Sequence, residues 1–108
     1  MNADLFIHAT ITDNEKRVLF YRSLPVFYQS GDKTLNESIV REVLNKLKSE
    51  HHMWAVSTGI YSSPEAGFIG DKFNQFLDLI KPHLYNPTGI ESSELIESDR
   101  YFRIWVTT

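Results

Sequence analysis

The chain has 108 residues, a net charge of −3 and no cysteine. This length predicts one globular domain over residues 1–108, and the missing cysteines exclude disulfides and thiolate chemistry. The acidic balance differs from the basic surface of nucleic-acid-binding proteins. No apolar run reaches the roughly 20 residues that span a bilayer, and the first residues do not resemble a signal peptide. We therefore expect a cytoplasmic domain that binds neither nucleic acid nor a membrane.

Two strands are predicted at the start of the chain. Apolar residues alternate through residues 4–12, DLFIHATIT, which indicates a strand with one buried face. DNEK, residues 13–16, is typical of a turn. Residues 17–29 are predicted to form a second strand, antiparallel to the first. Pro25 cannot donate to a strand ladder, so we expect it at a sheet edge, a bulge or a strand end.

A helix is predicted over residues 34–52, TLNESIVREVLNKLKSEHH. Thr34 and Glu37 have the spacing of a capping box. An apolar stripe at helical spacing follows, formed by Val40, Val43, Leu44 and Leu47. The next apolar run, MWAVST over residues 53–58, predicts a strand buried on both faces and therefore central in the sheet.

Glycines punctuate the next stretch, STGIYSSPEAGFIGDKF. The spacing of Gly67 and Gly70 does not match a phosphate-binding loop, and Asp71 would repel a phosphate. Ser63 as an N-cap, followed by proline, instead predicts a helix that ends before Pro82. A loop with the helix beginning at Asp71 is the alternative. If the helix starts early, the two glycines form a smooth patch that lets another backbone or a large side chain come close.

The last two strands are predicted over residues 93–98, SELIES, and 100–107, RYFRIWVT. In the second of them, alternation separates Phe102, Ile104 and Val106 from Tyr101, Arg103 and Trp105. The element order is then β-β-α-β-α-β-β. This order indicates an α+β two-layer sandwich, in which two helices pack on a mixed or mostly antiparallel sheet. Which face of the last strand the helices cover is left open.

The four histidines are the first candidates for catalysis. His51 and His52 fall at the expected end of the first helix, and His83 at the end of the second, where the helix dipole favours positive charge. His8 and Thr10 form a His-x-Thr pattern that two-histidine phosphoesterases use in two copies, and no second copy exists here. Neither Gly-x-Ser-x-Gly nor His-x-x-x-His is present. The sequence therefore predicts no catalytic residues, no metal ligands and no cofactor.

Acidic and aromatic residues gather near the C-terminus. Four acids stand without a base between them: Glu91, Glu94, Glu97 and Asp99. They lead directly into Tyr101, Arg103 and Trp105, whose residue types are enriched among interface hot spots. We therefore expect a non-catalytic domain that presents these residues to a protein partner. Its most concrete form is an immunity or antitoxin-like inhibitor that neutralises a basic toxin or nuclease, because carboxylates oppose a cationic site.

Two other functions remain open. A small phosphoester-processing enzyme would use His8 and Thr10, and His8 would then need a second histidine or a carboxylate within hydrogen-bond reach. A self-associating structural or accessory protein would instead use exposed apolar area to form oligomers.

Overall fold

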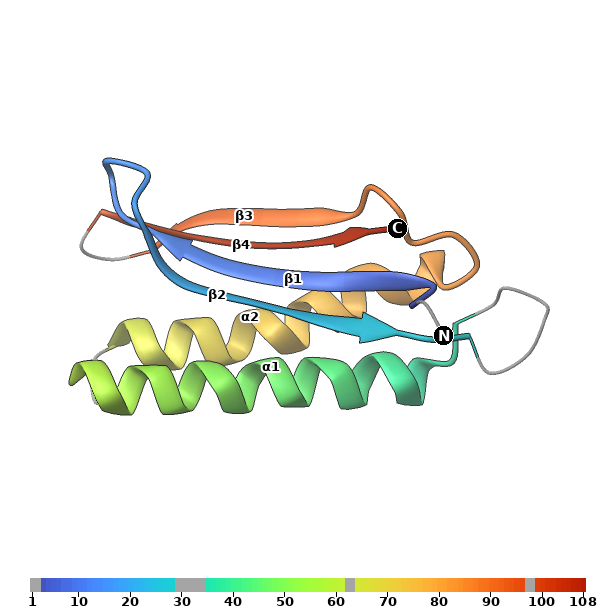
Figure 1. The fold of residues 1–108 in the computed structure, drawn as a ribbon, viewed down its shortest axis with the longest axis horizontal. Helices are drawn as coiled ribbons and strands as arrows, with labels where there is room; N and C mark the ends of the chain where they lie inside the picture. The colour runs from blue at the N-terminus through green and yellow to red at the C-terminus, as the bar shows by residue number, and fades with distance from the viewer. Residues whose placement is uncertain (1–2, 29–34, 62–63, 97–98) are drawn as a thin grey trace.

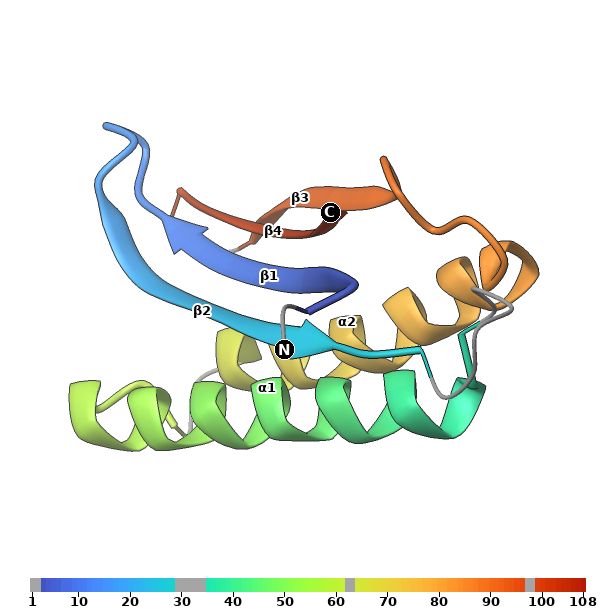
Figure 2. The same ribbon diagram turned by 45° about the vertical axis from the view of Figure 1, so that its right-hand side comes forward.

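The computed structural model of the protein describes residues 3–28, 35–61, 64–96 and 99–108, without the side chains of residues 64 and 65. Its elements are β1 (Leu5–Thr12), β2 (Val18–Val26), α1 (Glu37–Thr58), α2 (Pro64–Ile80), the short 3-10 helix η1 (Lys81–His83), β3 (Glu91–Ile96) and β4 (Arg100–Thr107). The strands form one antiparallel sheet in the order β2-β1-β4-β3. Both helices lie on the same side of it (Figures 1 and 2). The predicted α+β two-layer sandwich is confirmed.

The hydrophobic core lies between the sheet and the helices. Alternate residues of the two central strands are buried, namely Leu5, Ile7, Ala9 and Ile11 of β1 and Phe102, Ile104 and Val106 of β4. The helices contribute stripes at helical spacing, formed by Val40, Val43, Leu44 and Leu47 of α1 and by Ile69, Phe73, Phe76, Leu77 and Ile80 of α2. Burying each large side chain stabilises the fold by roughly 1.5–3 kcal/mol. The apolar faces predicted for β1 and α1 are confirmed.

Strands β2 and β3 are the edges of the sheet. Pro25 lies on the edge strand β2, which confirms one of the positions predicted for a residue that cannot donate to a strand ladder. The pairing of β1 with β2 is irregular between Ile11 and Thr12. The turn between these strands rises on the side away from the helices (Figures 1 and 2).

The predicted central strand over residues 53–58 is wrong. These residues form the last turns of α1, which ends at Thr58. Gly59 follows in the left-handed region, with φ 81°, and its N–H reaches the carbonyls of Ala55 and Val56. The element order is therefore β-β-α-α-β-β, with η1 after the second helix.

A short apolar run fits either a strand or a buried helix segment, so tertiary packing decided this one. The stripe of α1 continues at i, i+4 spacing from Leu47 through His51 to Ala55, and all three are buried. Met53, before Ala55, and Val56, after it, are 66% and 54% exposed. That pattern belongs to an amphipathic helix and leaves no strand buried on both faces.

Both helices begin near their predicted starts. In α1 the N-cap is Asn36, whose side chain accepts the N–H of Ser38 at 2.7 Å, so the helix begins two residues later than a Thr34 cap would give. Thr34 itself lies outside the described residues. The second helix begins at Pro64 and not at Asp71. Its predicted cap, Ser63, also lies outside the described residues.

The glycine patch of α2 makes no close contact within the described chain. A Cβ built on Gly67 would meet nothing within 4 Å, and one on Gly70 would meet the Lys48 Cε at 3.8 Å. The two glycines instead line a hollow of about 340 Å³ between α1 and α2. Within the described residues, no backbone or large side chain approaches the two glycines as closely as we expected.

Candidate functional site

The face of the sheet turned away from the helices is uncovered (Figures 1 and 2); we call it the open face. Because side chains alternate along β4, this face carries Tyr101, Arg103 and Trp105. Tyr101 is 43% exposed, Arg103 is exposed and Trp105 is half-buried. The question left open by the sequence is thus answered: the helices cover the other face of β4.

Trp105 belongs to a cluster of rings that we call the aromatic cluster, formed with His8 and Tyr21. Register places His8 directly opposite Trp105, and their rings stack with centroids 4.9 Å apart and planes 9° apart. The ring of Tyr21 lies 6.4 Å from that of Trp105 and is tilted by 15°. The guanidinium of Arg103 lies over the indole, with Cζ 4.3 Å from the ring centroid. Neighbouring side chains therefore hold Trp105 in place.

His8 is bonded at both ring nitrogens. Its Nδ1 lies 2.9 Å from the Tyr21 hydroxyl and its Nε2 lies 2.6 Å from the Thr107 hydroxyl. Burial, followed by the charge of Arg103, lowers the pKa of His8. The lowered pKa favours the neutral imidazole, in which one nitrogen donates and the other accepts.

The phosphoester alternative gains no support from this geometry. Both hydrogen-bond partners of His8 are hydroxyl groups, and neither is a histidine or a carboxylate. The Thr10 hydroxyl donates to the Phe20 carbonyl at 2.9 Å, so its proton is engaged by the backbone. The acid–base neighbour that the alternative requires is not among the described partners of His8.

Strand alternation divides the predicted acidic surface. Glu91 points to the open face, where its Oε2 accepts from Arg103 Nε at 3.0 Å and Nη2 at 2.6 Å. Glu94 is an odd number of residues away, so it points to the helix side and forms an ion pair with Lys72 of α2. Of the two acids on β3, Glu91 alone shares the face of Tyr101, Arg103 and Trp105.

The other two acids of the run lie at the turn between β3 and β4. Asp99 is exposed and has a φ of 56°, which an aspartate tolerates better than most residues. Glu97 lies outside the described residues. The structure therefore brings Tyr101, Arg103 and Trp105 of the predicted partner surface together on one face. It separates the acidic residues that were predicted to join them.

The open face is hollowed next to the β1–β2 turn, which sequence reasoning missed. The hollow has a volume of about 520 Å³ and is lined by residues of β1, the turn, β3 and β4. Its lining includes Thr12, Asp13, Lys16, Ser93, Tyr101 and Arg103. These residues are distant in the chain, and no local spacing signals that they meet.

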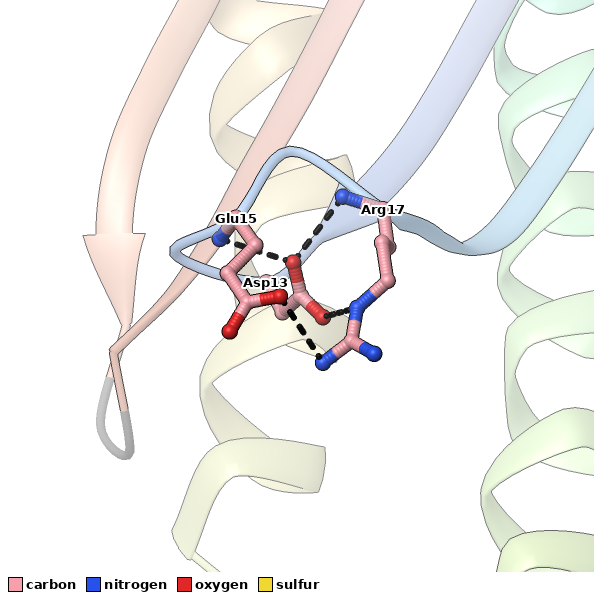
Figure 3. Close-up of polar contacts among 3 residues, drawn as sticks. All are labelled: Asp13, Glu15 and Arg17. Carbon is pink, nitrogen blue, oxygen red and sulfur yellow. Dashed lines mark hydrogen bonds and ion pairs between the residues drawn. The ribbon is translucent and has the colours of Figure 1, made fainter.

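The turn that forms one wall of the hollow is organised by Asp13 (Figure 3). One carboxylate oxygen of Asp13 accepts the backbone N–H groups of Glu15 and Arg17, both at 2.9 Å, and the other binds Arg17 Nε at 2.7 Å. The bond from the Arg17 backbone is the main cause that lowers the pKa of Asp13. These contacts hold the turn around Lys16, whose φ is 66°.

His51 lies in the core and not at a helix end, so its predicted role is wrong. Because α1 runs about two turns further, the imidazole is 3% exposed and contacts the rings of Phe20, Trp54 and Phe73. Its Nε2 has no hydrogen-bond partner among the described atoms. Burial, with a smaller effect of His52, lowers the pKa of His51 to about 4.

Comparisons with protein-family models, with curated proteins and with solved structures found no match to this chain. Within residues 3–28, 35–61, 64–96 and 99–108, no group of three or more acidic or histidine side chains is placed to hold a metal ion. No helix in the described part of the chain is long and apolar enough to cross a membrane.

Proposed function

We propose that the protein is a non-catalytic binding domain that holds a protein partner on the open face of its sheet. The observation that carries this proposal is the uncovered row of Tyr101, Arg103 and Trp105, with His8 and Tyr21 beside it. Tyrosine, tryptophan and arginine offer large contact areas at a small cost in conformational entropy, and they dominate interface hot spots.

The ordering of this face favours binding further. His8 is bonded to Tyr21 and Thr107, and Trp105 lies against both His8 and Arg103. These side chains have lost much of their rotamer freedom before a partner arrives. Less entropy is therefore lost on association.

A protein surface suits the open face better than single-stranded nucleic acid. Bases bind by stacking on free ring faces, and their phosphates by contacts to several unpaired cations. Here His8 stacks on Trp105, Arg103 lies over the same indole, and Glu91 compensates the charge of Arg103. The net charge of −3 also repels phosphates.

In its most concrete form, the proposal describes a cytoplasmic immunity or antitoxin-like protein whose partner is a basic toxin enzyme. The net charge of −3 and the exposed Asp99 support attraction to a basic partner. Glu91 and Glu94 contribute less to that attraction, because Arg103 and Lys72 pair with them. The row of Tyr101, Arg103 and Trp105 therefore supports the proposal more strongly than the acidic residues do.

Photo-crosslinking in cells of the native host tests the surface directly. A photoreactive phenylalanine derivative at Tyr101 is compared with the same group at Leu79 on α2, because both side chains are 43% exposed. We expect a specific crosslinked protein from position 101 and none from position 79. Equal crosslinking from both positions, or crosslinking from 79 alone, contradicts the proposed face. A crosslink only to a second copy of the chain supports the self-associating alternative.

Once the partner is identified, measurements of affinity and of enzyme inhibition test whether the protein is an immunity or antitoxin-like inhibitor. Replacing Trp105 by alanine should weaken binding by about 2 kcal/mol, or roughly 30-fold, whereas Leu79→Ala should leave it unchanged. If the partner is a toxin enzyme, adding the chain should abolish its activity at an equimolar ratio. A bound enzyme that remains fully active would contradict the inhibitor form.

A further inference from the structure

The hollow beside the β1–β2 turn contains more free hydrogen-bond donors than free strong acceptors. Within the described chain, the Lys16 ammonium forms no ion pair, and the hydroxyls of Thr12, Ser93 and Tyr101 have no hydrogen-bond partner. Arg103 uses Nε and Nη2 on Glu91, which leaves its Nη1 group free. The uncompensated ammonium of Lys16, the remaining Nη1 group of Arg103 and three hydroxyls can therefore donate into the same space.

Among the described residues that line the hollow, the one carboxylate, Asp13, already has its hydrogen-bond partners. Asp13 accepts two backbone N–H groups and the Arg17 guanidinium, as Figure 3 shows. Arg17 also compensates its charge. Asp13 therefore attracts an incoming cation weakly and leaves the free donors of Lys16 and Arg103 to determine what binds.

We propose that the hollow receives the carboxylate of an aspartate or glutamate side chain from the protein partner, bound by Lys16 and Arg103. This inference rests on the proposed function, because it names one contact of a partner held on the open face. A carboxylate supplies negatively charged acceptors for two cationic donors, and charge-assisted bonds are the stronger kind. The volume of about 520 Å³ admits a whole side chain, whose methylene groups contact the Tyr101 ring.

The overall charge of a partner and the charge of one of its side chains are separate quantities. A basic partner is attracted by the net charge of −3, which governs the rate of encounter. One carboxylate seated between Lys16 and Arg103 would instead determine the register in which the two surfaces dock. Tyr101, Arg103 and Trp105 would thus supply contact area for the partner, and the hollow would add specificity.

Titration of the ¹⁵N-labelled full chain tests the inference without knowledge of the partner. The probe is N-acetyl-glutamic acid α-amide, whose charge lies on the side chain, and its matched control is N-acetyl-glutamine amide. We expect saturable shifts confined to the amides of the hollow and to Arg103 Nε–H for the carboxylate probe. Adding 0.5 M NaCl should weaken them through screening. Equal shifts with the glutamine probe, or no saturable shift, would overturn the assignment.

A charge-removing pair of variants locates the site. Lys16→Gln should raise the dissociation constant of the carboxylate probe by up to about fivefold, as expected for one exposed ion pair. The control Lys46→Gln changes an exposed lysine of α1 and should have no effect. An equal loss in both variants would contradict the site. Tighter binding of methyl phosphate than of the carboxylate at the same amides would also overturn it, in favour of a phosphate ligand.

The two proposals fail separately. Retained crosslinking from position 101 without carboxylate binding would reject the occupant of the hollow and keep the open face as the partner site. Carboxylate binding together with crosslinking only from position 79 would reject the open face and, with it, the assignment of that carboxylate to the partner.

Discussion

The two sides of the sheet differ in how their histidines are hydrogen-bonded. On the open face, His8 bonds hydroxyl groups at both ring nitrogens and stacks on Trp105. On the helix side, His51 of α1 is buried against aromatic rings and its Nε2 is unpartnered in the described chain. Both imidazoles have a lowered pKa, but only the second leaves a buried polar atom without compensation. We therefore expect the helix-covered face to contribute most of the stability, and His51 a large part of its dependence on pH.

Truncating the core should produce the largest difference between the faces. Phe73 is 1% exposed and packs on Phe102 with ring centroids 5.5 Å apart. Phe73→Ala should lower the free energy of unfolding by about 3–5 kcal/mol, because it removes a buried ring and leaves a cavity. Tyr101→Ala on the open face should change it by less than about 1 kcal/mol. Urea denaturation followed by circular dichroism measures both, and equal losses would contradict the division of roles.

Acid should destabilise the fold through His51. Its pKa is about 4 in the folded chain against about 6.5 when unfolded. The unfolded state therefore binds more protons between these values, and the free energy of unfolding should fall by about 3 kcal/mol as the pH falls from 6.5 to 4. His51→Leu should remove this part of the pH dependence, whereas the exposed His83→Gln should retain it. An unchanged pH profile in His51→Leu would reject this cause.

The two glutamates of β3 should show the smallest difference between the faces. Glu94 pairs with Lys72, whose side chain is 11% exposed, whereas Glu91 pairs with Arg103, which is 46% exposed. Glu94→Gln leaves a largely buried ammonium with weaker partners and should cost about 1–2 kcal/mol. Glu91→Gln should cost less than about 1 kcal/mol. Thermal unfolding of both variants in low salt measures the order, and a larger loss in Glu91→Gln would reverse our interpretation.

Local periodicity was enough to predict most of the elements. The alternation in residues 4–12 and 100–107 predicted β1 and β4 and which side chains of each strand share a face, because a strand turns every second side chain the same way. The stripe that begins at Val40 predicted α1 in the same manner. The sequence also contained the information that Glu91 and Glu94 point to opposite faces of the sheet, since they are an odd number of residues apart in one strand.

Two features could not be predicted locally. The apolar run at residues 53–58 fits both a strand and a helix, and the burial of Ala55 with exposure of Met53 shows that packing selected the helix. The hollow joins residues from Thr10 to Arg103, which come together only when β1 and β4 pair. Neither outcome is encoded in the spacing of neighbouring residues.

The sequence by itself determined which side chains of each strand lie together, because alternation depends only on the geometry of the chain. Only the tertiary structure decided which of the two sets is covered. The helices pack on Phe102, Ile104 and Val106, which leaves Tyr101, Arg103 and Trp105 on the open face. The physical reason is that both sets contain large apolar side chains, but the first contains no polar group that would lose its bonds to water inside the core.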